Sequence, residues 1–371
     1  MLNSTDVFVV GGGPAGLAAA IAARQRGLRV VVADGGHPLI DKACGEGLMP
    51  DGLAALQRLG IQLSLADAHP FRGIRFVSSS SSADALFPNQ QCGLAVRRTV
   101  LHRVMIERAA QVGAELLWNA PVSGVSSEEV YVGNSVIRAR WIVGADGSNS
   151  RVRRWAGLDY CSRPRLRYAF RRHYRIAPWT DHMEVHWGHC CQGYATAVGP
   201  NQVCVVLASH DPKLRLQDGL PELPRLAERL QGAEPVTAER GAITGNRRFR
   251  QVWKDNIALL GDAAGTVDAI TGDGLQLAFS QAIALAECLQ SGSLAPYQAE
   301  HQRLFQRPFL MARLMLMLDG RPGLQHRAVQ AFRKHPEMFR RLLALHVGAL
   351  PSQHLVWDGL TLGWGLLTAQ P

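Results

Sequence analysis

Residues 6–16 read D-V-F-V-V-G-G-G-P-A-G, and this stretch decides the fold of the N-terminal part of the chain. Its first half, Val7 to Val10, is a short and mostly β-branched apolar run, which is typical of a buried parallel strand. Three glycines with G-x-G-x-x-G spacing come next: Gly11, Gly13 and Gly16. Because the small residues from Leu17 to Ala23 favour a helix, the stretch predicts a strand, a tight turn and a helix in succession.

Each residue of this glycine loop has an expected part in binding a dinucleotide. Gly11 has no Cβ and can adopt the turn, Gly13 lets a pyrophosphate approach the backbone, and Gly16 lets the helix pack closely on the strand. Pro14 and Ala15 complete the loop at the start of the helix. The phosphates would meet the helix N-terminus, where unpaired N–H groups and the positive end of the helix dipole favour an anion.

An acidic residue strengthens this interpretation. A second apolar run, Val30 to Ala33, ends at Asp34, about twenty residues after the glycines, where the dinucleotide fingerprint has an acid that hydrogen-bonds a ribose hydroxyl. The alternative is a plain βαβ unit with an incidental glycine turn. The combination of strand, glycines, helix and acid favours the dinucleotide site.

The charge of the chain limits its partners. The 371 residues carry a formal net charge of +10, which comes almost entirely from arginine. Such a charge suits nucleic acid, an anionic membrane surface or an anionic cofactor. Because the arginines are scattered and no nucleic-acid-binding module is visible, we expect no nucleic-acid partner. The sequence leaves the oligomeric state open.

Cysteine usage and hydropathy indicate the class of protein. The seven cysteines are an odd number without a C-x-x-C pair, so we expect neither a disulfide framework nor a metal site. No apolar run reaches the ~18 residues of a membrane span, and no signal peptide is visible. We therefore expect a cytoplasmic protein, with peripheral membrane contact through basic, methionine-rich C-terminal helices as an open alternative.

Two later stretches also place acids among glycines at the ends of expected strands. An apolar strand from Ile142 leads to Asp146 and a helical turn. Another, from Ile257, leads to Gly261 and Asp262. Beyond it, a small-residue helix opens with two glycines that form a second candidate anion site, Gly272 and Gly274.

The remaining pattern predicts a second, antiparallel sheet. Alternating apolar and polar residues from 168 to 208 indicate its strands, and residues 71–87 indicate a hairpin. Short strands between 115 and 143, with 135–138 and 141–143 counted separately, would form a small meander over the first βαβ unit. From Pro296 onward the chain is expected to be helical. Its methionine-rich stripe, Met311 to Leu318, is expected to be core, although methionine also suits an adaptable apolar site.

The three glycine-rich stretches together resemble the flavoprotein superfamily of p-hydroxybenzoate hydroxylase, and within it the geranylgeranyl-reductase-like branch. The resemblance covers about residues 5–290 and rests on motifs in the family's order. These are G-G-G-P-A-G at Gly11, G-A-D-G-S-N-S-R-V-R at Gly144, and L-L-G-D-A-A-G with G-D-G-L-Q-L-A from Leu259. The run C-G-E-G at Cys44 also resembles the reductase-like branch, whereas Gly265 replaces a histidine that is common among aromatic hydroxylases.

The resemblance implies an α/β fold with a doubly wound, Rossmann-like FAD-binding domain that is discontinuous in sequence. That domain would comprise residues 1–70, 93–160 and 245–295. An antiparallel β-sheet substrate domain would comprise 71–92 and 161–244. A C-terminal helical region would comprise 296–371.

The resemblance also assigns roles to single residues. Gly11, Gly13, Gly16 and Asp34 would hold the FAD pyrophosphate and the adenosine ribose, and Arg98 would contact the diphosphate. Asp146 would belong to a motif linked with FAD and the reductant, and Asp262 would accept a hydrogen bond from the ribityl chain. Gly272 and Gly274 would place N–H groups near the flavin pyrimidine ring. Ala269 and Gln276 depart from the family pattern, which leaves the contacts at the flavin edge open.

The flavin would supply the chemistry, and the protein would supply position and electrostatics. The leading hypothesis is a monooxygenase that uses FAD, NAD(P)H and O₂ to hydroxylate an apolar aromatic or polyketide-like small molecule. The alternative is a reductase of a double bond in an isoprenoid or lipid-like substrate, and a third hypothesis is a non-catalytic flavoprotein. A long apolar cavity at the flavin would favour a lipid, and a compact pocket with polar ends a small aromatic.

Candidate catalytic and substrate-binding residues follow from the same reasoning. Glu46 could take part in proton transfer, with Cys44 beside it, although a loop-stabilising role for Glu46 is equally compatible with the sequence. For the substrate pocket, the strand surface from Glu184 to Tyr194 is the best candidate. Its residues of interest are His186, Trp187 and Tyr194, each of which could instead serve sheet packing.

Overall fold

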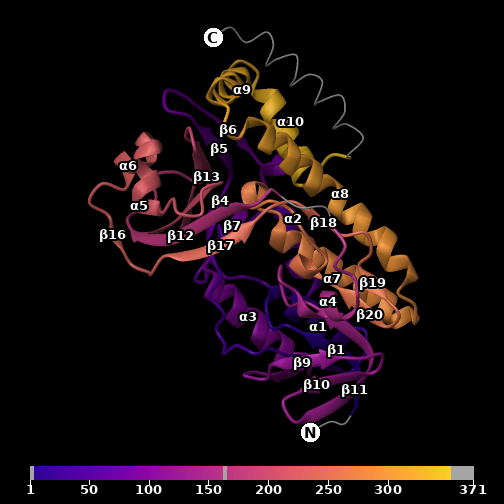
Figure 1. The fold of residues 1–371 in the computed structure, drawn as a ribbon. Helices are drawn as coiled ribbons and strands as arrows, with labels where there is room; N and C mark the ends of the chain where they lie inside the picture. Colours follow the sequence, from indigo (N-terminus) through magenta and orange to yellow (C-terminus); the bar gives the residue numbers. More distant parts are fainter. Residues whose placement is uncertain (1–3, 162–164, 352–371) are drawn as a thin grey trace.

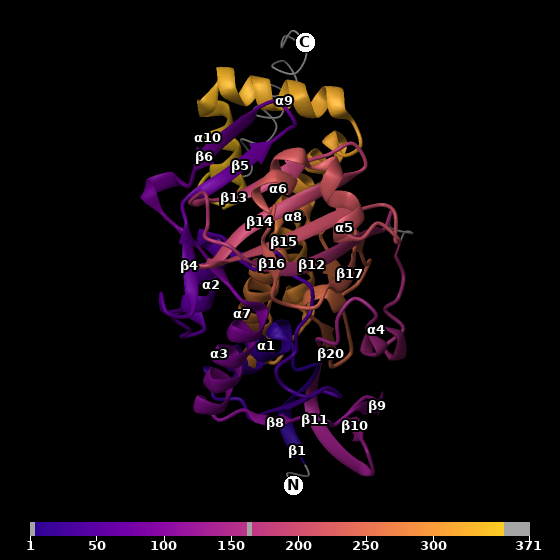
Figure 2. The ribbon, with the colours of Figure 1, turned by 90° about the vertical axis from the view of Figure 1, so that its left-hand side faces the viewer.

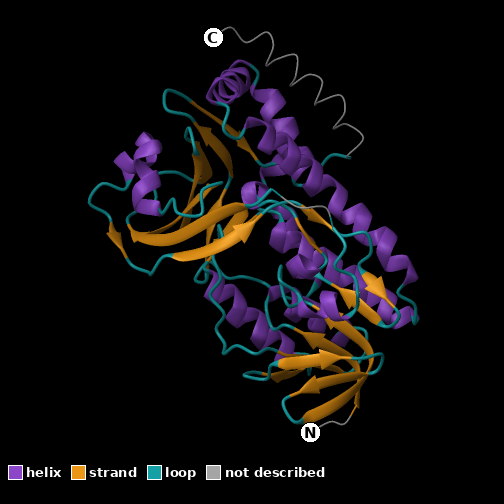
Figure 3. Ribbon diagram, in the orientation of Figure 1, coloured by secondary structure: helices purple, strands orange, loops and turns teal. Residues whose placement is uncertain are grey.

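The computed structural model describes residues 4–161 and 165–351. It contains two large β-sheets with helices packed on them (Figures 1 and 3), which confirms the expected α/β fold. The N-terminal end of β1 lies at one end of the molecule, and α9 and α10 lie at the other (Figures 1 and 2). The last twenty residues of the expected C-terminal helical region, 352–371, lie outside the described part of the chain.

The first sheet contains the predicted nucleotide-binding strands. Five parallel strands lie in the order β20-β11-β1-β2-β8. Their bounds are β1 Ser4–Val10, β2 Val30–Ala33, β8 Glu115–Leu117, β11 Ser135–Gly144 and β20 Ile257–Leu259. An antiparallel strand, β19 (Trp253–Lys254), adds to the edge beside β20. The three glycine-rich stretches follow β1, β11 and β20, three adjacent strands that end at the same edge.

The expected meander is present as the consecutive antiparallel strands β9 (Val122–Val125), β10 (Glu129–Val132) and β11, but it belongs to the first sheet and is not a separate sheet over the first βαβ unit. Residues 135–138 and 141–143 belong to one strand, β11, because nothing between them breaks an extended chain. Its second half is buried between β1 and β20. β9 and β10 extend the same sheet by antiparallel pairing onto the first half of β11.

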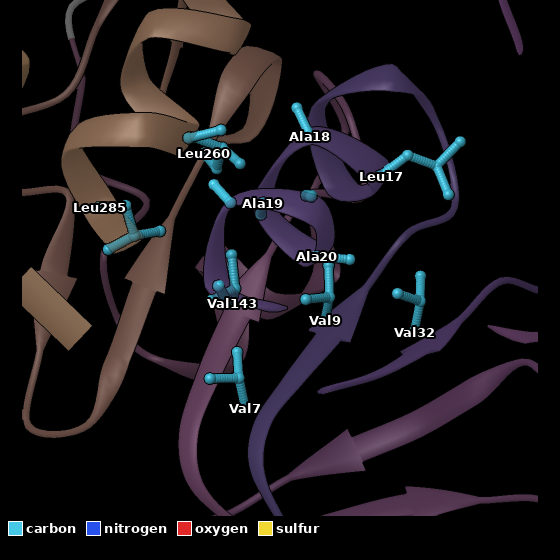
Figure 4. Packing of buried hydrophobic residues seen from close by; sticks show 14 of the residues in the cluster. Val7, Val9, Leu17, Ala18, Ala19, Ala20, Val32, Val143, Leu260 and Leu285 are labelled. Carbon is cyan, nitrogen blue, oxygen red and sulfur yellow. The ribbon is translucent and has the colours of Figure 1, made fainter. Parts of the chain in front are cut away.

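Small residues let helix α1 (Pro14–Arg24) lie close to this sheet. Its run of alanines is buried between strands β1, β2 and β11 and helix α7 (Figure 4). Alanine loses little conformational entropy in a helix, and its small side chain permits close approach. The other helices near this sheet are α2 Pro50–Arg58, α3 Arg98–Gln111, α4 Arg151–Trp155 and α7 Gly274–Ser291.

The second sheet has the order β16-β12-β15-β14-β13-β5-β6, with β17 also paired to β12. Its pairs are antiparallel as predicted, except that β13 runs parallel to β5. The bounds are β5 Gly73–Val77, β6 Ser82–Leu86, β12 Arg167–Arg175, β13 His182–Trp187, β14 Cys191–Gly199, β15 Gln202–Ser209, β16 Glu234–Pro235 and β17 Arg240–Thr244. α5 (Leu216–Gly219) and α6 (Pro224–Arg229) pack on one face of this sheet.

Short strands complete the structure between the two sheets. They are β3 Gly47–Leu48, β4 Ala68–Phe71 and β7 Gly93–Val96 in one small sheet, and β18 Arg247–Arg248 and β21 Gly265–Thr266 in another.

Three C-terminal helices cover the face of the second sheet opposite α5 and α6. They are α8 Ala295–Leu318, α9 Pro322–Lys334 and α10 Pro336–His346. α8 runs from the neighbourhood of α7 to the second sheet (Figure 1). Phe332 and Phe339 stack on Phe76 of β5 at centroid distances of 6.0 and 4.9 Å. Among the described residues, no helix combines the length and the apolar character that crossing a bilayer requires.

Candidate active site

A cavity of about 750 Å³ joins the ends of the nucleotide-binding strands to the second sheet and the C-terminal helices. Eleven of the twelve residues predicted to bind the cofactor line it, and we call these eleven the cofactor cradle. They are Gly11, Gly13, Pro14, Ala15, Asp34, Arg98, Asp146, Gly261, Asp262, Gly272 and Gly274. The twelfth, Gly16, lies behind them.

The three glycines of the first loop have the surroundings that a dinucleotide site needs. At Gly11, with φ +113°, an added Cβ would lie 2.4 Å from the carbonyl oxygen of Ala145. At Gly16 it would lie 1.8 Å from the carbonyl oxygen of Gly11, so this glycine permits close packing of helix and loop. At Gly13 it would meet no atom of the described part of the chain within 4 Å. The chain therefore leaves space at the one glycine beside which a pyrophosphate is expected.

The start of α1 is open to an anion. Gly13 is its N-cap residue, Pro14 occupies the first turn, and that turn contains no acidic residue. No side chain of residues 4–161 or 165–351 caps the helix. The free N–H groups and the helix dipole therefore attract negative charge. Arg98, only 9% exposed, also lines the cradle, and its Nε has no hydrogen-bond partner among the described residues.

Asp34 shapes the glycine loop directly. Its Oδ2 accepts a hydrogen bond of 2.6 Å from the N–H of Gly12, and its Oδ1 accepts one of 2.7 Å from the N–H of Gly36. The carboxylate thus joins the two loops that follow β1 and β2. Its contact with the adenosine ribose stays a prediction.

Asp146 caps α4 while facing the cradle. Its Oδ2 accepts hydrogen bonds from the N–H groups of Arg151 (2.6 Å) and Val152 (3.2 Å). Its Oδ1 is buried without a partner among the described residues. The carboxylate therefore caps the helix after β11, and its contact with the cofactor stays a prediction for the second oxygen.

The third glycine-rich stretch closes the cradle. Asp262 forms an ion pair with Lys42 at 2.9 Å, and both line the cavity. Gly272 has φ +73°, and Gly274 begins α7 with nothing within 4 Å of an added Cβ. The open glycines, the uncapped helix N-terminus and the unpartnered Arg98 and Asp146 atoms together fit FAD.

Sequence reasoning missed His102, which supports the first glycine loop. This fully buried side chain of α3 donates from Nε2 to the carbonyl of Gly12 (2.8 Å) and accepts at Nδ1 from the N–H of Ile40 (3.0 Å). Burial lowers the pKa of His102, which keeps the ring neutral as these two bonds require. One signal existed: His102 lies four residues after Arg98 and so shares its helix face.

The loop with Cys44 and Glu46 is fastened to the second sheet. Glu46 lines the cavity in a left-handed conformation (φ 60°) and is almost fully buried. Its carboxylate accepts hydrogen bonds from the backbone N–H of Arg98 (2.9 Å) and from Nε2 of His173 (2.6 Å). Arg171 donates to the other ring nitrogen of His173 (3.1 Å), so that nitrogen is an acceptor. No sequence pattern singled out His173.

Glu46, His173 and Cys204 are also a group of metal-ligand types, because their potential ligand atoms lie within 4.8 Å of one another. Here the carboxylate and the imidazole bond each other, and a guanidinium already occupies the second ring nitrogen. Burial raises the pKa of Cys204 well above its usual value, which disfavours the thiolate that metals bind. We assign the cluster to holding the Cys44 to Glu46 loop.

Beyond the cradle the cavity continues as an apolar arm. The arm lies between the second sheet and α8, α9 and α10. Its lining residues are Phe76, Val185, Met311, Leu314, Met315, Leu318, Phe332, Phe339, Leu342 and Leu343. The methionine-rich stripe was expected to be core, with an adaptable apolar site as the alternative. The structure shows both, because α8 packs on the buried clusters and also turns this face toward the cavity.

The predicted substrate residues separate on the two faces of the sheet. Tyr194 lines the cavity. Trp187 does not line it but stacks on Phe76 at 4.7 Å, so it supports the wall. His186 lies outside the lining, where its Nε2 pairs with Glu184 at 3.0 Å. Alternate residues of a strand face opposite sides, so His186 and Trp187 cannot share one pocket.

Comparisons with known proteins agree with this geometry. Residues 4–292 match a family model described as FAD binding domain. The menaquinone reductase of Mycolicibacterium smegmatis is 30% identical over 360 residues, which cover 86% of this chain and 85% of that protein. The digeranylgeranylglycerophospholipid reductase 1 of Methanothermobacter thermautotrophicus is 26% identical over 302 residues, 74% of each chain.

A solved structure shares the fold over nearly the whole length. The flavoprotein/dehydrogenase from Cytophaga hutchinsonii superposes with a TM-score of 0.85 at 18% identity, covering 98% of this chain and 99% of that one. The match to the family model covers the three strand ends that form the cradle. The chain therefore belongs to the FAD-binding-domain family of flavin-dependent oxidoreductases and resembles its geranylgeranyl-reductase-like branch.

Proposed function

We propose that the protein is an FAD-dependent reductase that saturates a carbon–carbon double bond in an isoprenoid or other lipid-like substrate. The observation that carries the proposal is the continuity of the cofactor cradle with the apolar arm in one cavity. A hydrocarbon chain could lie along the methionine and phenylalanine side chains of the arm with one end at the cradle. A small aromatic molecule would leave much of that apolar surface uncovered.

The relatives support the same substrate class. Both curated relatives named above are reductases, one of menaquinone and one of digeranylgeranylglycerophospholipid. This support reverses the order of the two hypotheses from the sequence, which placed hydroxylation first.

When bound and reduced, FAD supplies a hydride, and saturation of a double bond also needs a proton. Glu46 is a poor donor because its carboxylate already accepts two hydrogen bonds. Tyr194 directs its O–H to Gln192 at 2.9 Å. Cys44 lines the cavity, and its Sγ accepts from the N–H of Glu46 at 3.4 Å while its S–H remains to be donated. We assign the proton to the Cys44 thiol.

Hydroxylation is the second candidate, and one observation favours it. Thr196 and Tyr194 are polar residues on the sheet side of the cavity, and Thr196 pairs with Cys204, which contacts the loop of Cys44. The arm farther away is apolar. This change from polar to apolar lining would suit a substrate whose polar aromatic head lies beside the cofactor and whose chain lies in the arm. That reaction would consume O₂ and NAD(P)H.

The experiment that tests the proposal is a strictly anaerobic turnover. FAD-loaded protein is reduced chemically with dithionite, freed of excess dithionite and mixed with menaquinone or a geranylgeranyl lipid. Before mass spectrometry any quinol is reoxidised to the quinone, so that only saturation of a carbon–carbon double bond leaves two added hydrogens. We expect products heavier by two hydrogens, and none from an analogue with a saturated chain. A product heavier by one oxygen, formed only with O₂ and NAD(P)H, would overturn the reductase and support hydroxylation.

The role of Cys44 has its own test. Cys44→Ser retains the size of the side chain but replaces the thiol with a far weaker acid, so we expect a lower rate at unchanged substrate affinity. Cys92→Ser, at an exposed cysteine outside the cavity lining, is the matched control. Equal rates for Cys44→Ser and the wild type would remove Cys44 from the proton step.

A further inference from the structure

Arg167, the first residue of β12, is buried between the cofactor cradle and the second sheet, with only 1% of its surface exposed. Its Nη1 donates to Oδ1 of Asp268 at 2.9 Å, and its Nη2 donates to Oε1 of Gln192 at 2.9 Å. Two nitrogens of one guanidinium therefore bind groups from two parts of the chain that lie far apart in sequence.

The Asp268 side of this network leads to the cradle. Oδ1 of Asp268 also accepts from the N–H of Ile270 at 3.0 Å, and so caps the short 3₁₀ turn Ala269–Thr271. This turn ends at Gly272, and all four residues from Ala269 to Gly272 line the cavity. The position of Asp268 therefore determines where this loop lies relative to a bound cofactor.

The hydrogen bond to Gln192 connects Arg167 to the strand residues that line the cavity at Tyr194, which we call the substrate wall. The same Oε1 that accepts from Arg167 also accepts from the O–H of Tyr194 at 2.9 Å. Tyr194 is buried on β14 and lines the cavity. The hydroxyl of a cavity-lining ring is thus held through one amide oxygen by the guanidinium that holds Asp268.

A second carboxylate completes the surroundings of the cation. Asp319 follows the last residue of α8, and its Oδ2 lies 3.4 Å from Nε of Arg167 and 3.2 Å from Nε2 of His210. Burial alone would lower the pKa of Arg167, but Tyr194, Asp268 and Asp319 raise it. The guanidinium is therefore charged and links the sheet, the cradle loop and the end of α8.

We propose that Arg167 is a positioning residue that sets the separation between the cradle loop Asp268–Gly272 and the substrate wall at Tyr194. The planar fork of a guanidinium holds its partners in one fixed geometry, whereas an ammonium group cannot span both. The part that concerns the cofactor depends only on FAD binding. The part that concerns the substrate wall rests on the proposed function.

The experiment compares Arg167→Lys with Arg175→Lys, a control on the same strand whose ion pair with Glu234 is exposed. Both proteins are purified with FAD, and the visible spectrum and the reduction potential of the bound flavin are measured without substrate. We expect both variants to bind FAD. Only Arg167→Lys should change the spectrum and the potential, because only there can the cradle loop move.

Two further variants test the two ends of the Arg167 hydrogen-bond network separately, at Asp268 and at Tyr194. Asp268→Asn should change the flavin potential, since it alters the group that caps the cradle loop. Tyr194→Phe should leave the potential unchanged and raise KM for a lipid substrate, since it releases only the wall. In Arg167→Lys we expect kcat to fall about 10-fold to 100-fold, the usual effect of displacing reacting groups by about 1 Å.

The proposal would be overturned if Arg167→Lys bound FAD with the spectrum and potential of the wild type, whether or not its melting temperature fell. If Arg167→Lys does not fold, Asp268→Asn decides in its place, and an unchanged potential there has the same meaning. If the wild type turns over no lipid, the proposed function fails while the spectral comparison still tests the positioning role.

Discussion

Two glycines at the start of α1 have opposite surroundings. Among the residues that the structure describes, an added Cβ at Gly13 meets no atom within 4 Å, whereas at Gly16 it would lie 1.8 Å from the carbonyl oxygen of Gly11. The first glycine keeps space open for a ligand and the second permits packing. The same residue type therefore serves binding at one position and folding at the other.

This difference leads to a prediction for Gly13→Val. Its backbone is extended (φ −71°, ψ 177°), a conformation open to valine, so the variant should fold. The added methyl groups would occupy the space of the pyrophosphate, and the purified protein should be colourless. Visible absorbance and the melting temperature of the apoprotein check this. A yellow variant that retains FAD would mean that the loop does not hold the cofactor.

Gly16→Ala is the matched variant and should behave in the opposite way. Because its Cβ would collide with backbone rather than with a flexible side chain, we expect loss of soluble, folded protein. If Gly16→Ala instead folds as well as the wild type, the packing role assigned to this glycine is wrong.

At the scale of elements, one face of helix α8 both lines the cavity and packs against the core. Met315 lines the apolar arm and also packs against the buried cluster around Phe76. Met315→Trp should shorten the arm. Each methylene group excluded costs about 0.8 kcal/mol, so loss of two should raise KM for a long-chain substrate by roughly tenfold.

Steady-state kinetics with long and short chains check this effect of Met315→Trp, since a short chain should be unaffected. Leu310→Trp, on the same helix but outside the cavity lining, is the control. Equal effects on both chain lengths would argue against a chain in the arm.

A largely buried carboxylate, 16% exposed, joins α2 to α8 and introduces a pH dependence. Oδ2 of Asp51 lies 2.8 Å from Nη2 of Arg307. Burial nevertheless raises the pKa of Asp51 to about 6, because it outweighs the attraction of Arg307. The folded state therefore binds this proton more tightly than the unfolded state, whose value is near 3.8. The contribution of Asp51 to stability falls as the pH rises from about 4 to above 6.

Asp51→Asn should remove this dependence. Relative to the variant, the wild type should lose roughly 2 to 3 kcal/mol of unfolding free energy between pH 4 and pH 7.5, since one pKa unit corresponds to about 1.4 kcal/mol. Urea unfolding of both proteins at the two pH values gives the difference. A difference that does not change with pH would show that the pKa of Asp51 is not raised.

For the whole molecule, the cavity joins segments that are remote in sequence. The cradle draws on three strand ends, and the arm draws on the second sheet and the C-terminal helices. FAD binding should therefore stabilise the chain as a whole. At a free concentration 100 times its dissociation constant, a ligand adds about 2.7 kcal/mol.

We accordingly expect removal of FAD to lower the melting temperature by several degrees and to increase proteolysis of the described C-terminal helices. Thermal unfolding and limited proteolysis with and without FAD check this. Gly13→Val should show no response to added FAD. A response in that variant equal to the wild type would indicate binding outside the glycine loop.

Much of the cofactor site was predictable because its residues are local. The glycines of the first loop, Asp34, Asp146 and Asp262 each follow an apolar strand within a few residues, so period and spacing are enough to place them. The antiparallel sheet was likewise predicted from alternation. His173, His102 and Arg167 were missed, because each acts through partners on other elements, such as Glu46, Gly12 and Asp268.

By itself the sequence determined the α/β class, the nucleotide-binding strands and the glycine loop that opens the chain, since these depend on backbone freedom and hydrophobic period within short stretches. Only the tertiary structure decided that β8 and β11 belong to the same sheet. It also decided that His186 and Tyr194 lie on opposite faces of the second sheet. It also decided that the methionine stripe lines a cavity. Strand pairing and helix packing bring together residues more than a hundred positions apart, and no local pattern specifies which of them meet.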